Sequence, residues 1–471
     1  MELNLEKKIS EMIEIQKLLI DKLGRDKVLI DSELDDRYHH IWRMDEPLQA
    51  VAVTLPSSTK DVSEILKICH EHDQAVIAFG GLTNLVGGTE TTGNEVIIST
   101  ERLNKIEEVD PMSRTITVQA GVILEAVQNE AKEHQLLFPL NFGAKGTARI
   151  GGIIASNAGG LRVFRYGMTR NLVLGVEAVL ANGEVISSMK KIIKDNSAYD
   201  LKQLFVGSEG TLGIVTRAVL KLVEAPKSRA SVFVAMNEFQ QVVSFLKHMD
   251  AGLSGTLSGY ELMWDNYYNL ATAPPALSKP PIAHGYKYYV LIEALGSDLE
   301  KDQARIETLA EEAFGLGIIE EAVFANNHTD LEWFWKIRED VRAVVSQMKH
   351  DQHFDISLPI PLIGKMVDEM LAQLKALEGV GKVVSFGHVA DGNIHFVVEK
   401  EHLQKQLTEA INDIIYGPLM AVGGSVSAEH GVGLHKKEYL KLCRTAEEIS
   451  LMKLLKSTMD PKGILNPGKV F

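Results

Sequence analysis

Two histidines, His388 and His395, flank a short segment with Asp391-Gly392 at its centre. Asp-Gly is a favoured pair at the centre of a two-residue hairpin turn. If these residues form the turn, the two histidines lie directly opposite each other on adjacent strands, with Cβ atoms roughly 5 Å apart. Two imidazoles at that separation can bind one metal ion, and a carboxylate would complete a three-ligand open site. Glu429, which precedes His430, is the candidate carboxylate.

The same residues allow a second interpretation, in which the histidines are hydrogen-bonded to each other in a strand and bind no metal. Under the metal interpretation zinc is the first choice because imidazole ligands suit it, while Mn²⁺ or Fe²⁺ would also fit. If the bound ion activates a water, such a site would serve a metal-dependent hydrolase.

Glycine concentrates in three segments where predicted strands end, namely 79–88, 143–160 and 207–213. Glycine permits positive φ and close backbone approach, so successive N–H groups can converge on a diphosphate. Tight turns of a β-rich domain would use glycine in the same way. None of the segments carries the Gly-x-Gly-x-x-Gly dinucleotide fingerprint or a Walker A sequence. A phosphate-bearing cofactor would therefore be held by another device.

The composition is that of a folded enzyme, with 471 residues, 45% hydrophobic residues and a formal charge of −14. Such an acidic surface repels phosphate backbones, so nucleic-acid binding is not expected. The sequence contains no 18-residue apolar run for a transmembrane helix, and its N-terminus lacks the apolar region of a signal peptide. With only two cysteines, a disulfide framework is excluded, and a cytoplasmic location is expected.

The predicted elements change their order near residues 224–228, which we interpret as a domain boundary. Beyond it the pattern predicts a βαββαβ unit of the ferredoxin-like type, at 231–236, 238–250, 256–263, 286–295, 298–314 and 319–325. A helix over 329–348 and a second, βαββα run are predicted to follow, with elements at 355–358, 361–377, 382–388, 393–399 and 401–420. Two such units side by side would form one wide antiparallel sheet.

Several motifs together resemble one known family. They are the stretches Gly143–Gly167 and Phe205–Val215, the stretch Gly387–His395 around the two histidines, Ser427–Gly433, and the closing Asn466–Val470. In this order and spacing they resemble the D-lactate, D-2-hydroxyglutarate and glycolate dehydrogenase branch of the vanillyl-alcohol oxidase superfamily. The resemblance extends from about residue 45 to the end of the chain.

The resemblance implies an α+β fold: a two-subdomain FAD-binding domain, a ferredoxin-like substrate-binding cap with the wide antiparallel sheet, and a C-terminal helical segment. The implied division is 1–44 (helical), 45–224 (FAD), 225–425 (cap) and 426–471, which returns to the FAD domain. The implied FAD-binding residues are Gly80, Gly81, Leu82, Thr83, Asn84, Leu85, Gly143, Ala144, Thr147, Gly151, Gly152, Ala155, Asn157, Gly159, Gly160, Glu209, Gly210, Gly213, Ile214 and Val215.

The resemblance also implies that His388, His395 and Glu429 bind a divalent metal, and that His430 is the general base. Arg338 matches the arginine that grips a substrate carboxylate, which suits its forked guanidinium. The D-2-hydroxyglutarate enzymes carry a threonine, a lysine and an asparagine where this chain has Arg342, His353 and Val397. On a helix, Arg342 would lie one turn from Arg338 on the same face, and His353 would supply a charge that titrates near neutral pH. We therefore predict a D-2-hydroxy acid other than 2-hydroxyglutarate, either a lactate-like monocarboxylate or an acid with a differently shaped anionic tail.

The leading function is accordingly an FAD-dependent dehydrogenase that oxidises a small D-2-hydroxy acid to the 2-oxo acid. Its electron acceptor would be an electron-transfer flavoprotein, a quinone or a cytochrome, and a homodimer is possible. One alternative is a flavin subunit that needs a separate iron–sulfur partner, as in glycolate-oxidase-like complexes. The other is the metal-dependent hydrolase, which leaves the glycine-rich half unexplained.

Overall fold

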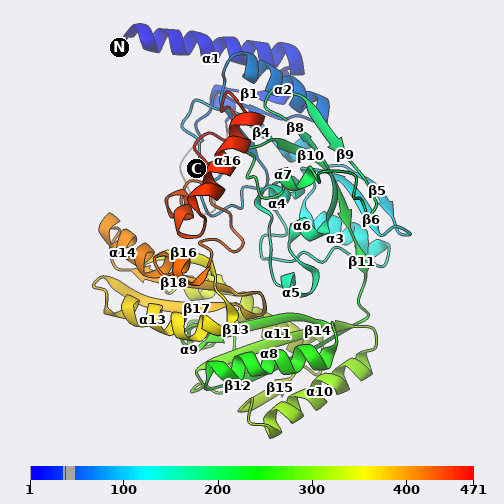
Figure 1. Cartoon of the computed structure of the whole chain (residues 1–471), viewed down its shortest axis with the longest axis vertical. Coiled ribbons are helices and arrows are strands. Elements are labelled where there is room, and N and C mark those ends of the chain that lie inside the picture. The colour runs from blue at the N-terminus through cyan, green and yellow to red at the C-terminus, as the bar shows by residue number, and fades with distance from the viewer. Residues whose placement is uncertain (1, 35–37, 39–47, 277) are drawn as a thin grey trace. The chain divides into compact units, whose positions relative to one another are not determined.

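The computed structural model describes residues 2–34, 38, 48–276 and 278–471, so the predicted boundary at 44/45 lies outside the described residues. The chain divides into two compact units (Figure 1). The first comprises Met1–Gly160, Gly167–Ala225 and Glu429–Phe471, and the second comprises Leu161–Tyr166 and Pro226–Ala428.

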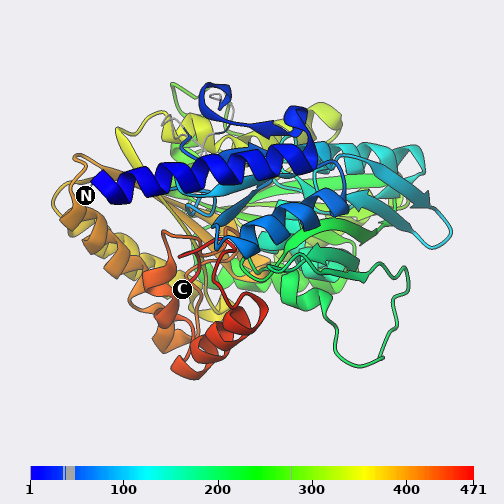
Figure 2. The same ribbon diagram turned by 90° about the horizontal axis from the view of Figure 1, so that it is seen from above.

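The first unit contains a four-stranded sheet with the order β1-β2-β4-β3. Its strands are β1 (Val28–Leu29), β2 (Ala52–Thr54), β3 (Val76–Phe79) and β4 (Val96–Ser99). Helices α1 (Glu2–Leu23) and α2 (Thr59–Glu71) lie side by side (Figure 2) and bury apolar side chains such as Leu19 and Leu66 in one core. Helix α2 begins at Thr59 because the Ser58 side chain accepts a hydrogen bond from the Asp61 amide at 3.1 Å and caps the helix. This sheet places the first glycine-rich segment directly after β3.

A second, antiparallel sheet of five strands has the order β5-β6-β10-β8-β9. Its strands are β5 (Ile106–Asp110), β6 (Thr115–Gln119), β8 (Val173–Val179), β9 (Val185–Ser188) and β10 (Ile214–Lys221). Helices α3 (Leu124–Glu133) and α4 (Ile150–Ser156) contribute to the core of this sheet. The smaller elements of the unit are β7 (Leu136–Leu137), α6 (Thr169–Leu172), α7 (Lys202–Phe205), β11 (Val223–Glu224) and α16 (Ala446–Met459).

The second unit is built on one seven-stranded antiparallel sheet with the order β15-β12-β14-β13-β17-β18-β16. Its strands are β12 (Ser228–Met236), β13 (Leu257–Trp264), β14 (Tyr288–Gly296), β15 (Glu321–Phe324), β16 (His350–Ser357), β17 (Val380–His388) and β18 (Asn393–Lys400). The first four strands have the ferredoxin-like order, and β13 pairs with β17 to join the two predicted runs. The wide antiparallel sheet is therefore confirmed.

The long helices of this unit are α8 (Phe239–Leu253), α10 (Leu299–Gly315), α11 (His328–Glu339), α13 (Ile363–Ala376) and α14 (Lys405–Tyr416). The prediction of one continuous helix over 329–348 is wrong, because the structure has two helices there. Helix α11 ends at Glu339. A new helix, α12 (Val341–Val345), begins because the Asp340 side chain accepts a hydrogen bond from the Ala343 amide at 3.1 Å and caps it. A helix that the sequence did not predict, α9 (Asp265–Thr272), buries Tyr267 and Tyr268.

One face of the sheet carries an aromatic core formed with α9, α11 and α12. It includes Phe233, Met263, Tyr289, Phe386 and Val397 from five different strands. Because strand side chains alternate between faces, the residues that share parity with Phe386 and Val397 point to this same face. His388 and His395 are among them.

Candidate functional site

The two histidines come together, but by a different register from the predicted one. In the β17–β18 pairing His388 lies opposite Asn393, and His395 lies opposite Phe386. Residues Val389–Asp391 form a 3-10 turn that Gly392 closes with a φ of 86°, so the loop holds four residues and the two-residue turn is wrong. His388 and His395 are diagonal neighbours on one face, and their ring centroids lie 5.5 Å apart.

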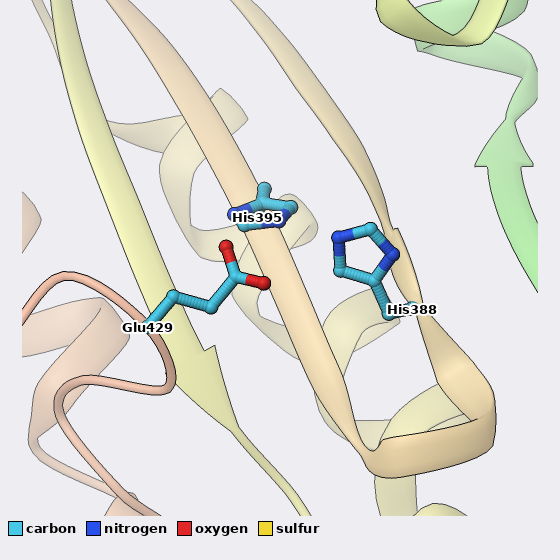
Figure 3. A group of neighbouring side chains, drawn as sticks. All are labelled: His388, His395 and Glu429. Carbon is cyan, nitrogen blue, oxygen red and sulfur yellow. The ribbon is translucent and has the colours of Figure 1, made fainter. Parts of the chain in front are cut away.

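Glu429 completes the predicted group. One ligand atom from each of His388, His395 and Glu429 lies within 4.8 Å of the others. One nitrogen of the His388 ring turns toward His395 and the Glu429 carboxylate (Figure 3). Both histidines and a carboxylate offer donor atoms that suit a divalent metal, so these residues fit such an ion.

His388 is held from behind by a buried carboxylate that the sequence analysis missed. Glu261, on β13, is 0% exposed, and its Oε1 lies 2.7 Å from Nδ1 of His388. Its Oε2 lies 2.8 Å from Nη2 of Arg338. Burial raises the pKa of the Glu261 carboxyl, but the charges and hydrogen bonds of His388 and Arg338 outweigh burial, and the net pKa lies below its usual value. Its sequence signal is a lone acidic residue within an otherwise uncharged, buried strand.

A second buried carboxylate, Asp355 on β16, binds the segment that precedes Glu429. Its Oδ1 accepts a hydrogen bond from Asn393 Nδ2 at 2.8 Å, and its Oδ2 accepts one from the amide of Ala428 at 3.1 Å. Ser425 pairs with Ser357 at the end of the same strand. The segment before Glu429 is therefore held along β16, and Glu429 follows it by one peptide bond. A carboxylate oxygen of Asp355 also lies within 4.8 Å of ligand atoms of Glu429 and His430.

Of the predicted substrate residues, the structure brings Arg338 to this group. Its side chain is 4% exposed, and its guanidinium carbon lies 4.8 Å from the centre of the Phe386 ring. Arg342 is exposed and lies beyond the helix break at Asp340, so the expected shared helical face is not formed. His353 lies on β16 opposite Val397, two positions from Asp355, and pairs with Asp351 at 2.5 Å.

Near the turn, burial raises the pKa of the Asp391 carboxyl to about 6, and the charge of His388 opposes that rise. The negative charges of Glu261 and Asp355 also raise the pKa of the Asp391 carboxyl. Together with Glu429, these carboxylates give the site an excess of acidic groups, which favours a cation.

In the first unit the three glycine-rich segments pack against one another. A Cβ atom on Gly81 would lie 2.2 Å from the carbonyl oxygen of Thr147, so only glycine allows this approach. The amides of Gly207 and Glu209 donate to the carbonyls of Ile154 and Ala155 at 3.0 and 2.8 Å.

Within the described residues the backbone amides of Gly81, Leu82 and Thr83 donate no hydrogen bond. Leu82 has a φ of 55°, a conformation uncommon for leucine. These amides donate no hydrogen bond in the described part of the chain and lie on a strained loop beside the N-terminus of the glycine-rich helix α4, so they fit the diphosphate of FAD.

The side chain of Glu209 binds backbone amides of the segment that follows His430. It is partly buried, and it accepts hydrogen bonds from the amides of Val432 and Gly433 at 2.8 and 2.9 Å. Burial raises its pKa, and these two amides oppose the rise. Asn466, which the sequence analysis did not assign, donates to the Glu209 carbonyl at 2.6 Å and ties the closing motif to this segment.

The remaining predicted cofactor residues lie in these segments or next to them. Gly151, Gly152 and Ala155 belong to α4, and Asn157 is the left-handed residue that ends it. Ile214 and Val215 begin β10, and their side chains are buried in two different cores of the unit.

Comparison with known proteins matches both halves of the chain. Residues 50–188 match an FAD-binding domain, and residues 225–470 match the C-terminal domain of FAD-linked oxidases. The mitochondrial D-2-hydroxyglutarate dehydrogenase of Danio rerio is 37% identical over 88% of this chain and 77% of its own length. The corresponding protein of Bos taurus is 36% identical over 88% of this chain and 76% of its own length.

Among solved structures, p-cresol methylhydroxylase superposes with a TM-score of 0.76 at 16% identity, covering 98% of this chain and 97% of its own. This likeness confirms the vanillyl-alcohol oxidase type of fold. None of the helices within the described residues is long and apolar enough to cross a membrane.

The expected cytoplasmic location is contradicted, because the D-2-hydroxyglutarate dehydrogenases of Danio rerio, Bos taurus and Arabidopsis thaliana are named as mitochondrial. A scarcity of cysteine indicates a reducing compartment and does not distinguish one such compartment from another. The expectation of an FAD-dependent oxidoreductase is confirmed by the matched domains and relatives. The chain belongs to the family of FAD-linked oxidases, in which the relatives from Danio rerio and Bos taurus are named D-2-hydroxyglutarate dehydrogenases.

Proposed function

We propose that this protein oxidises a D-2-hydroxy acid to the 2-oxo acid, using FAD and a divalent metal held by His388, His395 and Glu429. The observation that carries the proposal is that ligand atoms of His388, His395 and Glu429 lie within 4.8 Å of one another in a member of the FAD-linked oxidase family. Zinc remains the first choice for the ion, and Mn²⁺ or Fe²⁺ would also suit these ligands.

The bound metal would supply Lewis acidity that lowers the pKa of the substrate hydroxyl. His388 and His395 would bind it through ring nitrogens, and Glu429 through its carboxylate. His430 follows Glu429 directly and would take the hydroxyl proton as general base. Arg338 would bind a substrate carboxylate, since its buried Nε donates no hydrogen bond within the described residues.

Bound FAD would accept the hydride from the substrate α-carbon. We propose that the backbone of 80–85 holds the diphosphate and that 143–160 and 209–215 contact the rest of the cofactor. The free amides of Gly81, Leu82 and Thr83 support this assignment. As domains we propose 45–224 for FAD, 225–425 for substrate and 426–471 as the returning segment.

For the substrate we propose a D-2-hydroxy acid other than 2-hydroxyglutarate, although the relatives from Danio rerio and Bos taurus are named for that acid. Val397 is 1% exposed and packs in the aromatic core, so it offers no hydrogen bond on the metal face. Arg342 is exposed. Of the residues predicted to bind the substrate, Arg338 is thus the one with a buried positive charge beside the proposed metal ligands.

A single experiment tests the activity. Purified protein is mixed anaerobically with a series of D-2-hydroxy acids, and loss of the oxidised flavin absorbance is recorded. The L-enantiomers serve as controls. Reduction of the bound FAD by a D-acid, but not by its L-enantiomer, would support the proposed oxidation. Failure of every D-acid to reduce bound FAD would contradict the proposal.

A further inference from the structure

Glu261 is shared between two groups that the proposed function treats separately. Its Oε1 lies 2.7 Å from Nδ1 of His388, and its Oε2 lies 2.8 Å from Nη2 of Arg338. The carboxylate is fully buried, so water does not compete for either oxygen. One side chain therefore contacts a proposed metal ligand and the proposed substrate arginine at once.

The position of Glu261 follows from the sheet. Leu262 pairs with Gly387 across β13 and β17, which brings the preceding Glu261 beside the following His388 on one face. Arg338 reaches the carboxylate from α11, and its guanidinium lies over the Phe386 ring. The hydroxyl of Tyr267 donates to the Arg338 carbonyl at 2.9 Å and fixes the end of that helix. Arg338 is thus held on a second side, and His388 is placed by the strand register.

A carboxylate that accepts a hydrogen bond from Nδ1 fixes the tautomer of an imidazole and leaves Nε2 to bind a metal. The same negative charge neutralises the buried Arg338 guanidinium, for which the described residues supply no other ion pair. Removing it would affect both partners.

We infer that Glu261 is a positioning residue that couples metal binding at His388 to the orientation of Arg338. The inference rests on the proposed function, because it takes His388 as a metal ligand and Arg338 as the substrate arginine. It follows that a change at Arg338, which is not a ligand, alters the affinity for the metal through Glu261 alone. It also follows that this effect disappears once Glu261 loses its charge.

The sheet offers a matched control in Glu293. This residue, on β14, is 1% exposed and forms ion pairs with Arg162 and Arg229. It is an equally buried carboxylate paired with arginine in the same unit, but within the part of the chain that the structure describes it forms no hydrogen bond or ion pair with His388 or Arg338. Glu293→Gln therefore reports the general cost of neutralising a buried acid in this sheet.

The experiment measures the affinity of the full-length, FAD-loaded protein for Zn²⁺ by competition with a chromogenic chelator, without substrate. Glu261→Gln should weaken metal binding by about 10–100-fold, while Glu293→Gln should change it by less than about twofold. Arg338→Lys keeps the positive charge but loses the fork, and it should weaken metal binding about fivefold or more when Glu261 is present. In the Glu261→Gln background, Arg338→Lys should have no further effect.

Unchanged metal affinity in Arg338→Lys would overturn the inference, and this variant leaves Glu261 and every proposed ligand in place even if Glu261→Gln fails to fold. Equal losses in Glu261→Gln and Glu293→Gln would overturn it as well. Failure of the proposed function looks different: wild-type protein would then bind no Zn²⁺, or would bind it and oxidise no D-2-hydroxy acid.

Discussion

Asp355→Asn keeps the shape of a buried side chain and removes one of its two acceptors. Asn393 Nδ2 donates to one oxygen of Asp355 at 2.8 Å, and the Ala428 amide donates to the other at 3.1 Å. Because both neighbours are donors, an asparagine can satisfy only one of them, and its amino group would face the second. A buried donor left without an acceptor costs about 1–3 kcal/mol. For a unit of this size, each kcal/mol lowers Tm by about 2–4 °C, so we expect a fall of about 2–12 °C.

The substitution should also loosen the segment that carries Glu429, so affinity for Zn²⁺ should fall about tenfold or more. Scanning calorimetry and chelator competition measure the two effects. Asp351→Asn is a control on the same strand: this carboxylate is partly exposed, and its partner His353 can present either a hydrogen-bond donor or an acceptor to the new amide. If Asp355→Asn melts like the wild type and binds metal equally well, Asp355 does not position this segment.

Four further outcomes are expected. His388→Ala or Glu429→Gln should lower kcat/KM by about 10–100-fold or more in a dye-reduction assay while the flavin absorbance stays unchanged, because these residues do not hold FAD. Chelator treatment should reproduce that loss and added metal should reverse it; full activity after verified metal removal would make the histidines structural. Acid precipitation should release one FAD per chain, and a pellet that retains the flavin would indicate a covalent bond. Arg338→Ala should raise KM by about 10–100-fold for an acid with a second anionic group and less for lactate, through loss of charge-assisted hydrogen bonds; if D-2-hydroxyglutarate has the highest kcat/KM in the series, the differences at Arg342, His353 and Val397 do not set specificity.

The fold was readable from the sequence where local pattern and tertiary structure agree. The alternation of strands and helices after residue 225 predicts the ferredoxin-like order because each element is long and its apolar period is clear. The break at Asp340 was not predicted, since the apolar pattern continues across it and the capping hydrogen bond to Ala343 is a local competitor. Helix α9 was hidden by its shortness and by the proline-rich loop that follows it.

The supporting carboxylates of the site could not be predicted from spacing. Glu261 contacts a histidine 127 residues later, and Asp355 contacts the Ala428 amide 73 residues later. Such pairs depend on strand register across the sheet, which no local signal sets. What the sequence does offer is an acidic residue among apolar neighbours, Glu261 in β13 and Asp355 between Phe354 and Ile356 in β16, and a buried acid requires a partner.

The pairing of His388 with His395 shows why an incorrect turn still predicted the correct neighbours. The sequence suggested a two-residue turn, and the loop has four residues, so the register differs by two positions. Because strand side chains alternate with a period of two, this shift keeps both histidines on one face and changes them from directly opposed to diagonal. A shift of one would have turned one imidazole to the opposite face, toward the side where Phe354 meets Tyr416 of α14, and no shared ion could be bound. Any insertion or deletion of a single residue within 389–392 should therefore abolish metal binding, whereas a two-residue change should weaken it less.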